Sequence, residues 1–458
     1  MRQPATRLQV SGHRFLTRRM THALVRGDVR MFDDPLRAQS LSMLVGTVLA
    51  TVGIAVCAVI AVLRPAGDIG DASVVMVGQT GALYVRVDDT LHPVVNLTSA
   101  WLITGRPVPP RVVSQSAVDA RPRGATMGIP AAPQHISPGA PAESAMVCDE
   151  GGNSTVSIGV PADAVTVPQL PVLATPRGAN PALTYLLYGG RKARVDLRHP
   201  AVVRALRLDG VPPIPLSPAV LAALPEAPAI VPPHIPDRGS PGPGPLHAYS
   251  VGSVLTVPRA GRVDEEFVVL GGGLQRIGEV AADLIRYTDG RLGAHMPTVP
   301  PDILGAVPVL DSLPVGSYPE RAGVTRARVV CARWRSRAEA SGAHSTVVVA
   351  DGTPVAGAAL AQADGAGPAV DAVALAGGGT LLVRSVALGG GADDAGPLFV
   401  LSDTGALFCL ENADTATRLG LIPPGSAIPW PILAVLPRGP DLSVRAASVA
   451  GDVLVARP

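Results

Sequence analysis

The stretch Leu41–Leu63, LSMLVGTVLATVGIAVCAVIAVL, contains no charged residue and is bracketed by Arg37 and Arg64. A helix crosses the hydrocarbon core of a bilayer with about 20 consecutive apolar residues, and only Gly, Ser and Thr weaken this run. A cleaved signal peptide is the alternative, but its apolar region extends over about 7 to 15 residues and ends at a small-residue cleavage site. The run is longer than that and begins deeper in the chain. We therefore predict a single transmembrane helix over residues 40–64.

The two flanks of this run differ in charge. Residues 1–39 hold eight arginines and three acidic residues, whereas Asp68 and Asp71 follow the lone Arg64 on the other side. Lys and Arg next to a membrane helix are retained on the cytoplasmic side. We therefore expect residues 1–39 in the cytoplasm and about 395 residues, the outer part, on the other side of the membrane.

The outer part has the composition of a globular, strand-rich protein. The chain carries a net charge of +2, and because residues 1–39 account for +5, the remainder carries −3. This excludes a basic surface of the kind that binds nucleic acid. Hydrophobic residues make 47% of the chain and aromatic residues only 3%, so we expect a core of Val, Leu and Ala. The 50 Gly and 47 Pro make turns frequent without reaching the range typical of disorder.

Three of the four cysteines, Cys148, Cys331 and Cys409, follow the membrane run. The sequence alone permits any of three pairings. Cys409 lies in a strand-like run, where it would pack as a small hydrophobe, whereas Cys148 and Cys331 lie in stretches that we interpret as irregular. We therefore expect Cys148 to pair with Cys331. Three free buried thiols are the alternative.

A hairpin followed by a helix recurs in the outer part. Two copies share Thr-Gly-Ala-Leu and an aromatic residue, at 80–84 and 404–408, and two looser copies turn at Gly189-Gly190 and at 271–273. Such a unit cannot bury both of its faces alone, so it needs neighbours or a shared core. For the looser copies the alternative is coincidence, because Gly turns are common hairpin signals. The expected hairpins and helices are 74–87 with 92–103, 184–197 with 200–208, 266–278 with 280–287, and 398–410 with 413–421.

Proline-rich and glycine-rich segments connect these units. Residues 128–141 and 211–245 are rich in proline, which fixes an extended backbone and blocks helix continuation. We therefore expect them to be spacers or surface straps. The Gly/Ala-rich stretch 352–371 and the turn at 389–391 are expected to form mobile loops.

The common sequence motifs of enzymes are missing from the chain. Lys192 is the only lysine, so there is no GxxxxGK[ST] loop to cradle nucleotide phosphates. The sequence also contains no GxSxG, HExxH or CxxC motif. The acidic pairs at 88–89 and 393–394 are expected to be solvated rather than metal-bound. We therefore predict no catalytic site, no cofactor and no metal.

The segment before the membrane run has the pattern of a basic amphipathic helix. Apolar residues recur at helical spacing from Leu8 to Leu24, with Phe15 and Leu16 near the centre. Such a helix beside a membrane either lies on anionic lipid headgroups or docks on a protein partner, with Phe15 and Leu16 as the contact in both cases. The arginines expected on its other faces are Arg7, Arg14, Arg18 and Arg26.

Several short motifs carry a family resemblance. They are VSGHRFLTRR at 10–19, HALV at 22–25, DPLRAQ at 34–39, TGALYV at 80–85, LHPV at 91–94, GIP at 128–130, PW at 429–430 and LPRGP at 436–440. In these motifs the chain resembles the EccB family of the mycobacterial type VII (ESX) secretion machinery. The resemblance covers nearly the whole chain and weakens between residues 250 and 396.

This resemblance implies a structural subunit of a bacterial inner-membrane secretion complex with an α+β fold. It implies a cytosolic amphipathic helix, one transmembrane helix and a periplasmic, β-rich domain in which four repeat units surround a central domain closed by a disulfide. The Cys148–Cys331 pair fits this plan, and Cys409 departs from it.

The resemblance also implies partners. These are the FtsK-like ATPase EccC, the membrane proteins EccD and EccE, the mycosin protease and further copies of the chain itself, with no nucleic acid. The residues expected to contact partners are Arg14, Phe15, Leu16, Arg18, Arg19, Asp34, Pro35, Leu36 and Arg37.

The span and the hairpins, together with the central core that the resemblance implies, give the expected domain organisation. Residues 1–39 form the cytosolic segment, 40–64 the membrane helix, 65–110 repeat unit 1, 111–175 the first part of the central core, 176–246 repeat unit 2 with a Pro-rich connection, 247–310 repeat unit 3, 311–396 the second part of the core, and 397–458 repeat unit 4 with a Pro-rich tail.

The sequence thus favours a scaffold that organises the periplasmic side of a secretion complex. A membrane-anchored cell-wall enzyme is the alternative, and it would need an acid or nucleophile set that the sequence does not reveal. ATP hydrolysis is a third interpretation, which the missing P-loop disfavours.

Overall fold

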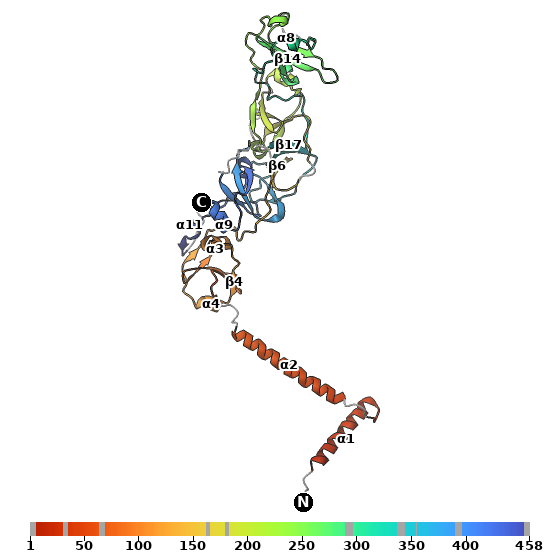
Figure 1. Cartoon of the computed structure of the whole chain (residues 1–458), viewed down its shortest axis with the longest axis vertical. Helices are drawn as coiled ribbons and strands as arrows, with labels where there is room; N and C mark the ends of the chain where they lie inside the picture. The colour runs from red at the N-terminus through yellow and green to blue at the C-terminus, as the bar shows by residue number, and fades with distance from the viewer. Residues whose placement is uncertain are drawn as a thin grey trace. The chain divides into compact units, whose positions relative to one another are not determined.

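The computed structural model describes residues 6–30, 35–63, 69–161, 165–178, 183–288, 296–336, 344–353, 355–389 and 396–452 (Figure 1). It separates into two units, one of residues 1–70 with 112–120, and one of residues 71–111 with 121–458. The first unit contains the helices α1 (Arg7–Arg26), α2 (Pro35–Leu63) and α4 (Gln115–Asp119). The second unit contains nearly all the strands, so the mixed helix-and-sheet class expected from the sequence is confirmed.

The central sheet of the second unit has the strand order β17-β16-β6-β7-β19-β18. Its strands come from two stretches of the chain far apart in sequence, and β6 and β16 lie side by side and antiparallel. Strand β19 joins β7 in parallel, a pairing that no tight turn can make. The strand bounds are β6 (Ser144–Glu150), β7 (Asn153–Ile158), β16 (Val329–Arg335), β17 (His344–Ala350), β18 (Ala358–Ala359) and β19 (Ala372–Leu375).

Four further sheets complete the second unit. Their orders there are β24-β5-β3-β2-β1, β11-β8-β9-β10-β12, β13-β14-β15 and β22-β21-β20-β23. The bounds are β1 (Val74–Val77), β2 (Leu83–Val87), β3 (Thr90–Val94), β5 (Thr126–Met127), β8 (Val172–Pro176), β9 (Thr184–Tyr188), β10 (Arg191–Val195), β11 (Ile214–Leu216), β12 (Glu226–Ile230), β13 (Val254–Val257), β14 (Glu265–Leu270), β15 (Gly273–Ile277), β20 (Leu381–Val386), β21 (Leu398–Leu401), β22 (Leu407–Cys409), β23 (Ser426–Pro429) and β24 (Ala450–Gly451). One more short strand is β4 (Arg111–Val113).

The helices of the second unit are short. Those with a side-chain N-cap include α3, capped by Asn96, and α9, capped by Asn412, whose carboxamide oxygens each accept from a backbone N–H three residues on. The bounds are α3 (Leu97–Thr104), α5 (Pro200–Ala205), α6 (Pro218–Ala222), α7 (Glu279–Thr288), α8 (Ile303–Ala306), α9 (Ala413–Arg418), α10 (Trp430–Leu433), α11 (Val444–Ala447) and the 3-10 turns η1 (Gly244–Leu246) and η2 (Ala376–Gly378).

A hairpin occurs at each of the four places where the sequence indicates one, in the pairs β1/β2, β9/β10, β14/β15 and β21/β22. Two of them close through two-residue loops, at Gly189-Gly190 and Gly271-Gly272. The helix expected over 92–103 is wrong at its start, because residues 92–94 belong to β3 and α3 begins at Leu97. The helices expected over 200–208 and 413–421 end early, at Ala205 and Arg418.

The Pro-rich segment 211–245, expected to be a spacer or surface strap, forms regular secondary structure. It supplies β11 and β12 to the same sheet as the β9/β10 hairpin. It also supplies α6, whose Ala219 and Val220 are buried in the core of the central sheet. Proline occupies the first position of α6, where the missing N–H has no partner to lose.

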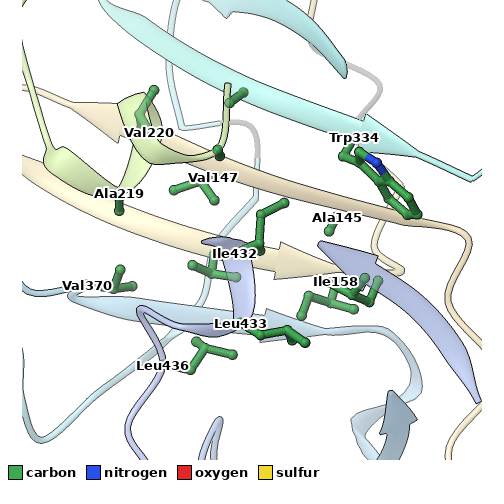
Figure 2. Close-up of a cluster of buried hydrophobic side chains, with 14 of the residues drawn as sticks. Ala145, Val147, Ile158, Ala219, Val220, Trp334, Val370, Ile432, Leu433 and Leu436 are labelled. Atoms are coloured by element: carbon green, nitrogen blue, oxygen red, sulfur yellow. The ribbon is translucent and has the colours of Figure 1, made fainter. Parts of the chain in front are cut away.

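The largest core lies on the central sheet (Figure 2). Strands β6 and β7 contribute Val147 and Ile158, and β16 contributes Trp334. Helices α6 and α10 cover these side chains, with Val220 from α6 and Leu433 from α10 drawn close to them. Apolar surface removed from water stabilises a fold by about 25 cal/mol per Å². The core therefore joins segments from residue 142 to residue 436 into one packed body.

Strand pairing crosses two of the domain boundaries expected from the sequence. The boundary between 396 and 397 separates β20 from β21, yet these strands are antiparallel neighbours. The boundary between 175 and 176 cuts β8, which pairs with β9 of the expected repeat unit 2. Both expected boundaries differ from the structure for the same reason. The residues of β8 and β20 do not indicate which strands they pair with.

The cysteines Cys148 and Cys331 lie in the regular strands β6 and β16, so the interpretation of their surroundings as irregular is wrong. Both strands are buried almost throughout, and strands covered on both faces show no polar alternation.

Candidate functional site

Helix α1 is held by local contacts at both ends. The side chain of Gln9 accepts from the backbone N–H of Thr6, with 3.0 Å between nitrogen and oxygen. At the other end Gly27 takes the left-handed conformation, with φ of 66°, and its N–H donates to the carbonyl of Ala23 at 2.9 Å. The helix therefore begins and ends at residues whose own side chains and backbone conformation specify its ends.

The apolar side of α1 is uncovered. Phe15 and Leu16 are each 56% exposed, Met20 is 68% exposed and Leu24 is 84% exposed. Large apolar side chains in this number and at helical spacing form a binding face rather than a core. The face expected from the sequence is therefore present and is free to contact lipid or protein.

The arginines of α1 fall on two sides. Arg14 and Arg18 lie four residues apart and share the side opposite to the apolar face. Arg19 follows Phe15 by four residues and Arg26 follows Arg19 by seven, so both lie on the apolar side near Phe15. The expectation that Arg26 lies on another face is thus wrong. Two positive charges border the apolar contact itself.

Helix α2 has the properties of a membrane span. Within the described residues it is the one helix long and apolar enough, and its candidate segment Gln39–Ile60 has 22 residues. At a rise of 1.5 Å per residue this segment covers about 33 Å, which matches a hydrocarbon core of about 30 Å. The hydroxyls of Thr47 and Thr51 donate to carbonyls four residues back, at 2.7 and 2.6 Å. These bonds leave neither hydroxyl donor unsatisfied in hydrocarbon.

Four of the expected partner-contact residues precede the membrane segment. Asp34 lies outside the described residues. Pro35, Leu36 and Arg37 form the first turn of α2, where the backbone is described. Proline at the first helical position is pre-organised for the helix, so the motif starts α2 directly. The other five expected residues lie on α1.

A disulfide joins Cys148 of β6 to Cys331 of β16. The register places the two residues directly opposite each other in neighbouring antiparallel strands. Both are buried, with Met146, Val329 and Val348 around them. The bond spans 183 residues of sequence and closes the central sheet covalently. Cys57 and Cys409 are free thiols.

Two aspartates that the sequence analysis did not single out hold segments onto the central sheet. Asp149 of β6 forms an ion pair with Arg177, and its carboxylate accepts from the backbone N–H of Ser217 at 2.7 Å. Ser217 is the N-cap of α6, so this contact fixes the helix that covers the core. The Asp149 side chain is 2% exposed, and a buried charge needs such partners.

Asp371 secures the Gly/Ala-rich stretch 352–371. Its carboxylate accepts from the backbone N–H groups of Ser154, Gly365 and Asp364 at 2.7, 2.7 and 3.0 Å. Burial raises the pKa of this carboxyl, but the three N–H groups outweigh burial and hold the pKa below its ordinary value. The stretch expected to be a mobile loop is therefore tied to β7 at its end. The sequence signal was an aspartate at the end of a Gly/Ala-rich stretch, which is a weak signal.

The side chain of Lys192 makes contacts within the fold. Its ammonium donates to the carbonyl of Leu221 at 2.7 Å and lies 5.6 Å from the ring centre of Tyr185. Burial lowers its pKa, and Glu226 partly opposes this. Among the described residues no group of three or more His, Cys, Asp or Glu is placed to hold a metal ion.

The sequence matches, over residues 2–456, the family model described as "Type VII secretion system ESX-1, transport TM domain B". It is 34% identical to the protein named ESX-3 secretion system ATPase EccB3 of Mycolicibacterium smegmatis, over 99% of this chain and 92% of that protein. It resembles a chain in the intact ESX-5 inner membrane complex, with a TM-score of 0.72, 30% identity, and coverage of 99% of this chain and 97% of that one. It also resembles a chain of the EccB3 dimer from the ESX-3 core complex, with a TM-score of 0.73, 31% identity, and coverage of 83% and 100%.

The apolar helix, the strand-rich unit and these likenesses together define the class: a membrane component of type VII secretion complexes. The chain belongs to the EccB family. The family resemblance inferred from the sequence motifs is thereby confirmed. The relative's name contains the word ATPase, but the sequence of this chain contains no P-loop motif. Its single lysine, Lys192, lies in β10 and donates to a backbone carbonyl.

Proposed function

We propose that the chain is a structural scaffold subunit of an ESX inner-membrane complex, which organises and stabilises the periplasmic side of that complex. The observation that carries the proposal is family membership over residues 2–456, because solved relatives are parts of ESX inner membrane complexes. The uncovered helices α1 and α2 support it, since a subunit of an assembly needs surfaces that only partners or lipid cover.

In this proposal α2 crosses the inner membrane once, with α1 in the cytoplasm and the second unit in the periplasm. The support is the excess of arginine before α2 and the acidic residues after it. A disulfide in the second unit agrees with an oxidising compartment.

We propose that α1 and the start of α2 contact protein partners. The uncovered side chains of Phe15 and Leu16 would bind an apolar groove, with Arg19 at its edge and Arg14 and Arg18 toward acidic groups or lipid headgroups. The segment from Asp34 to Arg37 would meet the same complex at the membrane surface. EccC, EccD, EccE and the mycosin protease are the proposed partners, and self-association is supported by the solved EccB3 dimer.

We also propose that the four hairpin-and-helix segments are repeat units arranged around the disulfide-closed central sheet. The four hairpins at the expected places support this, and so does the core that draws α6 and α10 onto that sheet. Because α6 and α10 are needed to cover β6 and β7, the central sheet depends on segments outside its own strands.

The test is recovery of the full chain from membranes in mild detergent. A complex of high mass that contains the chain in more than one copy is expected. The double substitution Phe15→Ser with Leu16→Ser should release the chain from that complex. Val25→Ser is the matched control, because Val25 is 82% exposed on the same helix but lies on the side of Arg14 and Arg18. A free monomer from the unmodified chain would overturn the proposal.

A further inference from the structure

A small cavity lies at one end of the central sheet, on the face that also carries the disulfide. Its volume is about 40 Å³. One water molecule needs about 10 to 15 Å³ of such space, so the cavity has room for about three or four oxygen-sized atoms. It therefore fits one small ion or one terminal group of a larger molecule.

The register of the sheet brings polar side chains from three neighbouring strands to this cavity. Arg335 and Ser144 are directly opposite each other in β16 and β6. Met146 of β6 lies between Arg333 of β16 and Ser157 of β7 and is directly opposite each of them. Opposite residues, and residues two apart on one strand, point to the same face of a sheet. Two guanidinium groups and two hydroxyls therefore share one small area of this face.

The core on the other face of the sheet is separate from this cavity. Trp334 and Ile158, which follow Arg333 and Ser157 in the chain, belong to that core (Figure 2). Successive side chains of a strand point to opposite faces, so the cavity side chains can be replaced without removing any side chain from that core. Packing of the core therefore does not account for this polar cluster.

The two guanidinium groups lie here without a carboxylate. Arg333 is partly buried and Arg335 is exposed, and neither forms an ion pair with any residue that the structure describes. No acidic residue is among the described residues that line the cavity. Burial, and then the charge of Arg335, lower the pKa of Arg333, but a guanidinium keeps its charge at neutral pH. An anion in the cavity would offset the repulsion between these two charges.

A buried hydroxyl lines the same cavity. Ser157 is only 4% exposed, yet its hydroxyl forms no hydrogen bond with the residues that the structure describes. Buried polar side chains are nearly always hydrogen-bonded, to protein or to a bound molecule. A serine hydroxyl can donate to an anionic oxygen. The Ser157 hydroxyl is therefore available to a ligand in the cavity.

These donors match a phosphate group. Each guanidinium offers paired N–H donors that fit two oxygens of a phosphate or a carboxylate. A carboxylate brings one negative charge and two oxygens, whereas a phosphate monoester brings a charge of about −1.5 to −2 and three terminal oxygens. Two adjacent positive charges with two hydroxyls therefore complement phosphate in both charge and number of donors.

We propose that this cavity binds a phosphate group, either inorganic phosphate or the terminal phosphate of a small monoester. The phosphate oxygens would accept from Arg333, Arg335 and Ser157. Because Met146 and Ser157 are buried while Arg335 is exposed, the ester oxygen would point outward past Arg335. This site goes beyond the scaffold role and does not depend on it, since assembly is measured by recovery of the complex and the cavity by binding of phosphate.

The test uses the full chain in a neutral detergent and a phosphate-free buffer, with inorganic phosphate titrated by isothermal calorimetry. Saturable binding that weakens with added sodium chloride is expected. Arg333→Gln should weaken it about tenfold, Ser157→Ala about fivefold and Arg335→Gln about threefold. Arg328→Gln is the matched control and should leave binding unchanged, because Arg328 directly precedes β16 and is paired with Glu150.

Two further ligands identify the source of the phosphate. Glucose 6-phosphate should bind as inorganic phosphate does if the site takes the terminal phosphate of a larger molecule, whereas binding of inorganic phosphate alone would assign the site to the free ion. Acetate should bind at least about tenfold more weakly, because it brings half the charge and fewer acceptor oxygens. Acetate binding as tight as that of phosphate would overturn the proposal.

Thermal unfolding separates binding from a structural role. Phosphate should raise the melting temperature of the unmodified chain and leave that of Arg333→Gln unchanged. Without phosphate, Arg333→Gln should melt no lower than the unmodified chain, because the substitution removes a repulsion. Ser157→Ala keeps the test decisive if Arg333→Gln does not fold. Phosphate binding that all three substitutions leave unchanged, as attraction to the arginines of α1 would give, would overturn the proposal, and so would the absence of saturable binding.

Discussion

Helix α2 and the central sheet are both rich in valine, but the valine side chains are exposed on α2 and buried in the sheet. Val48 and Val52 of α2 are each 53% exposed, whereas Val147 and Val156 of β6 and β7 are fully buried. The strands bury their side chains under α6 and α10 of the same chain. Helix α2 has no such cover within the described residues, so lipid or other spans must supply it. Composition alone therefore does not distinguish an apolar segment that its own chain buries from one that lipid or a partner must cover.

The largest effect is expected from the covalent closure of the sheet. Replacing Cys148 and Cys331 together by serine should lower the free energy of unfolding of the second unit by about 5 kcal/mol, because the open chain regains the entropy of a very long loop. Thermal unfolding of the full chain, followed by near-UV circular dichroism, measures it. The Cys409→Ser control should lose far less. Equal melting of the double variant and the unmodified chain would mean that packing alone holds β6 against β16.

The contrast between buried and uncovered side chains can be tested with one matched pair. Ile158→Ala removes a fully buried side chain of the core and should cost about 2 to 5 kcal/mol. Leu49→Ala removes a side chain that is 66% exposed on α2 and should change unfolding of the second unit by less than about 0.5 kcal/mol. Denaturant titration in detergent measures both. A comparable loss from Leu49→Ala would show that α2 is packed into the fold.

The β9/β10 turn offers a pair of neighbouring glycines. Gly190→Ala should cost about 3 kcal/mol, since it combines left-handed strain with a clash against the Ser345 carbonyl. Gly189→Ala should cost about 1 kcal/mol, because only the strain applies. The difference in melting temperature between the two variants is the readout. Equal melting would mean that the turn does not lie on β17 in solution.

The effect expected at Asp371 is smaller than those of the disulfide and of Gly190, and it depends on pH. The pKa of its carboxyl is lower in the folded chain than in the unfolded chain, so the stability it adds is present above about pH 4 and is lost as the pH falls through the folded value. Asp371→Asn should cost about 2 kcal/mol at neutral pH. That difference should shrink in acid, as measured by urea unfolding across pH. A constant difference would assign the loss to packing.

Local patterns in the sequence were sufficient for some elements. The apolar helix α2, the two Gly-Gly turns and the strongly amphipathic α7 are all marked by their own residues. Local patterns were not sufficient to predict which distant segments pair or pack together. The parallel pairing of β7 with β19, and the packing of α6 and α10 on the central sheet, depend on segments that no local period connects.

The strands of the central sheet show why the stretches around Cys148 and Cys331 looked irregular in the sequence. In β6 the five residues from Ala145 to Asp149 are all buried, the charged Asp149 included. A strand covered on both faces has no polar side to reveal it. The Cys148–Cys331 pair was therefore expected for a reason that the structure does not support, although the bond itself is present.

The sequence separation of the two bonded cysteines also determines the order in which the thiols of the second unit are synthesised. Synthesis adds about 5 to 20 residues per second, so Cys148 waits about 10 to 40 seconds for Cys331. Cys331 in turn precedes Cys409 by about 4 to 16 seconds at the same rate. The native partner is thus the first thiol of the second unit to reach β6, and a nascent chain that oxidises as it emerges meets the correct cysteine before the competing one.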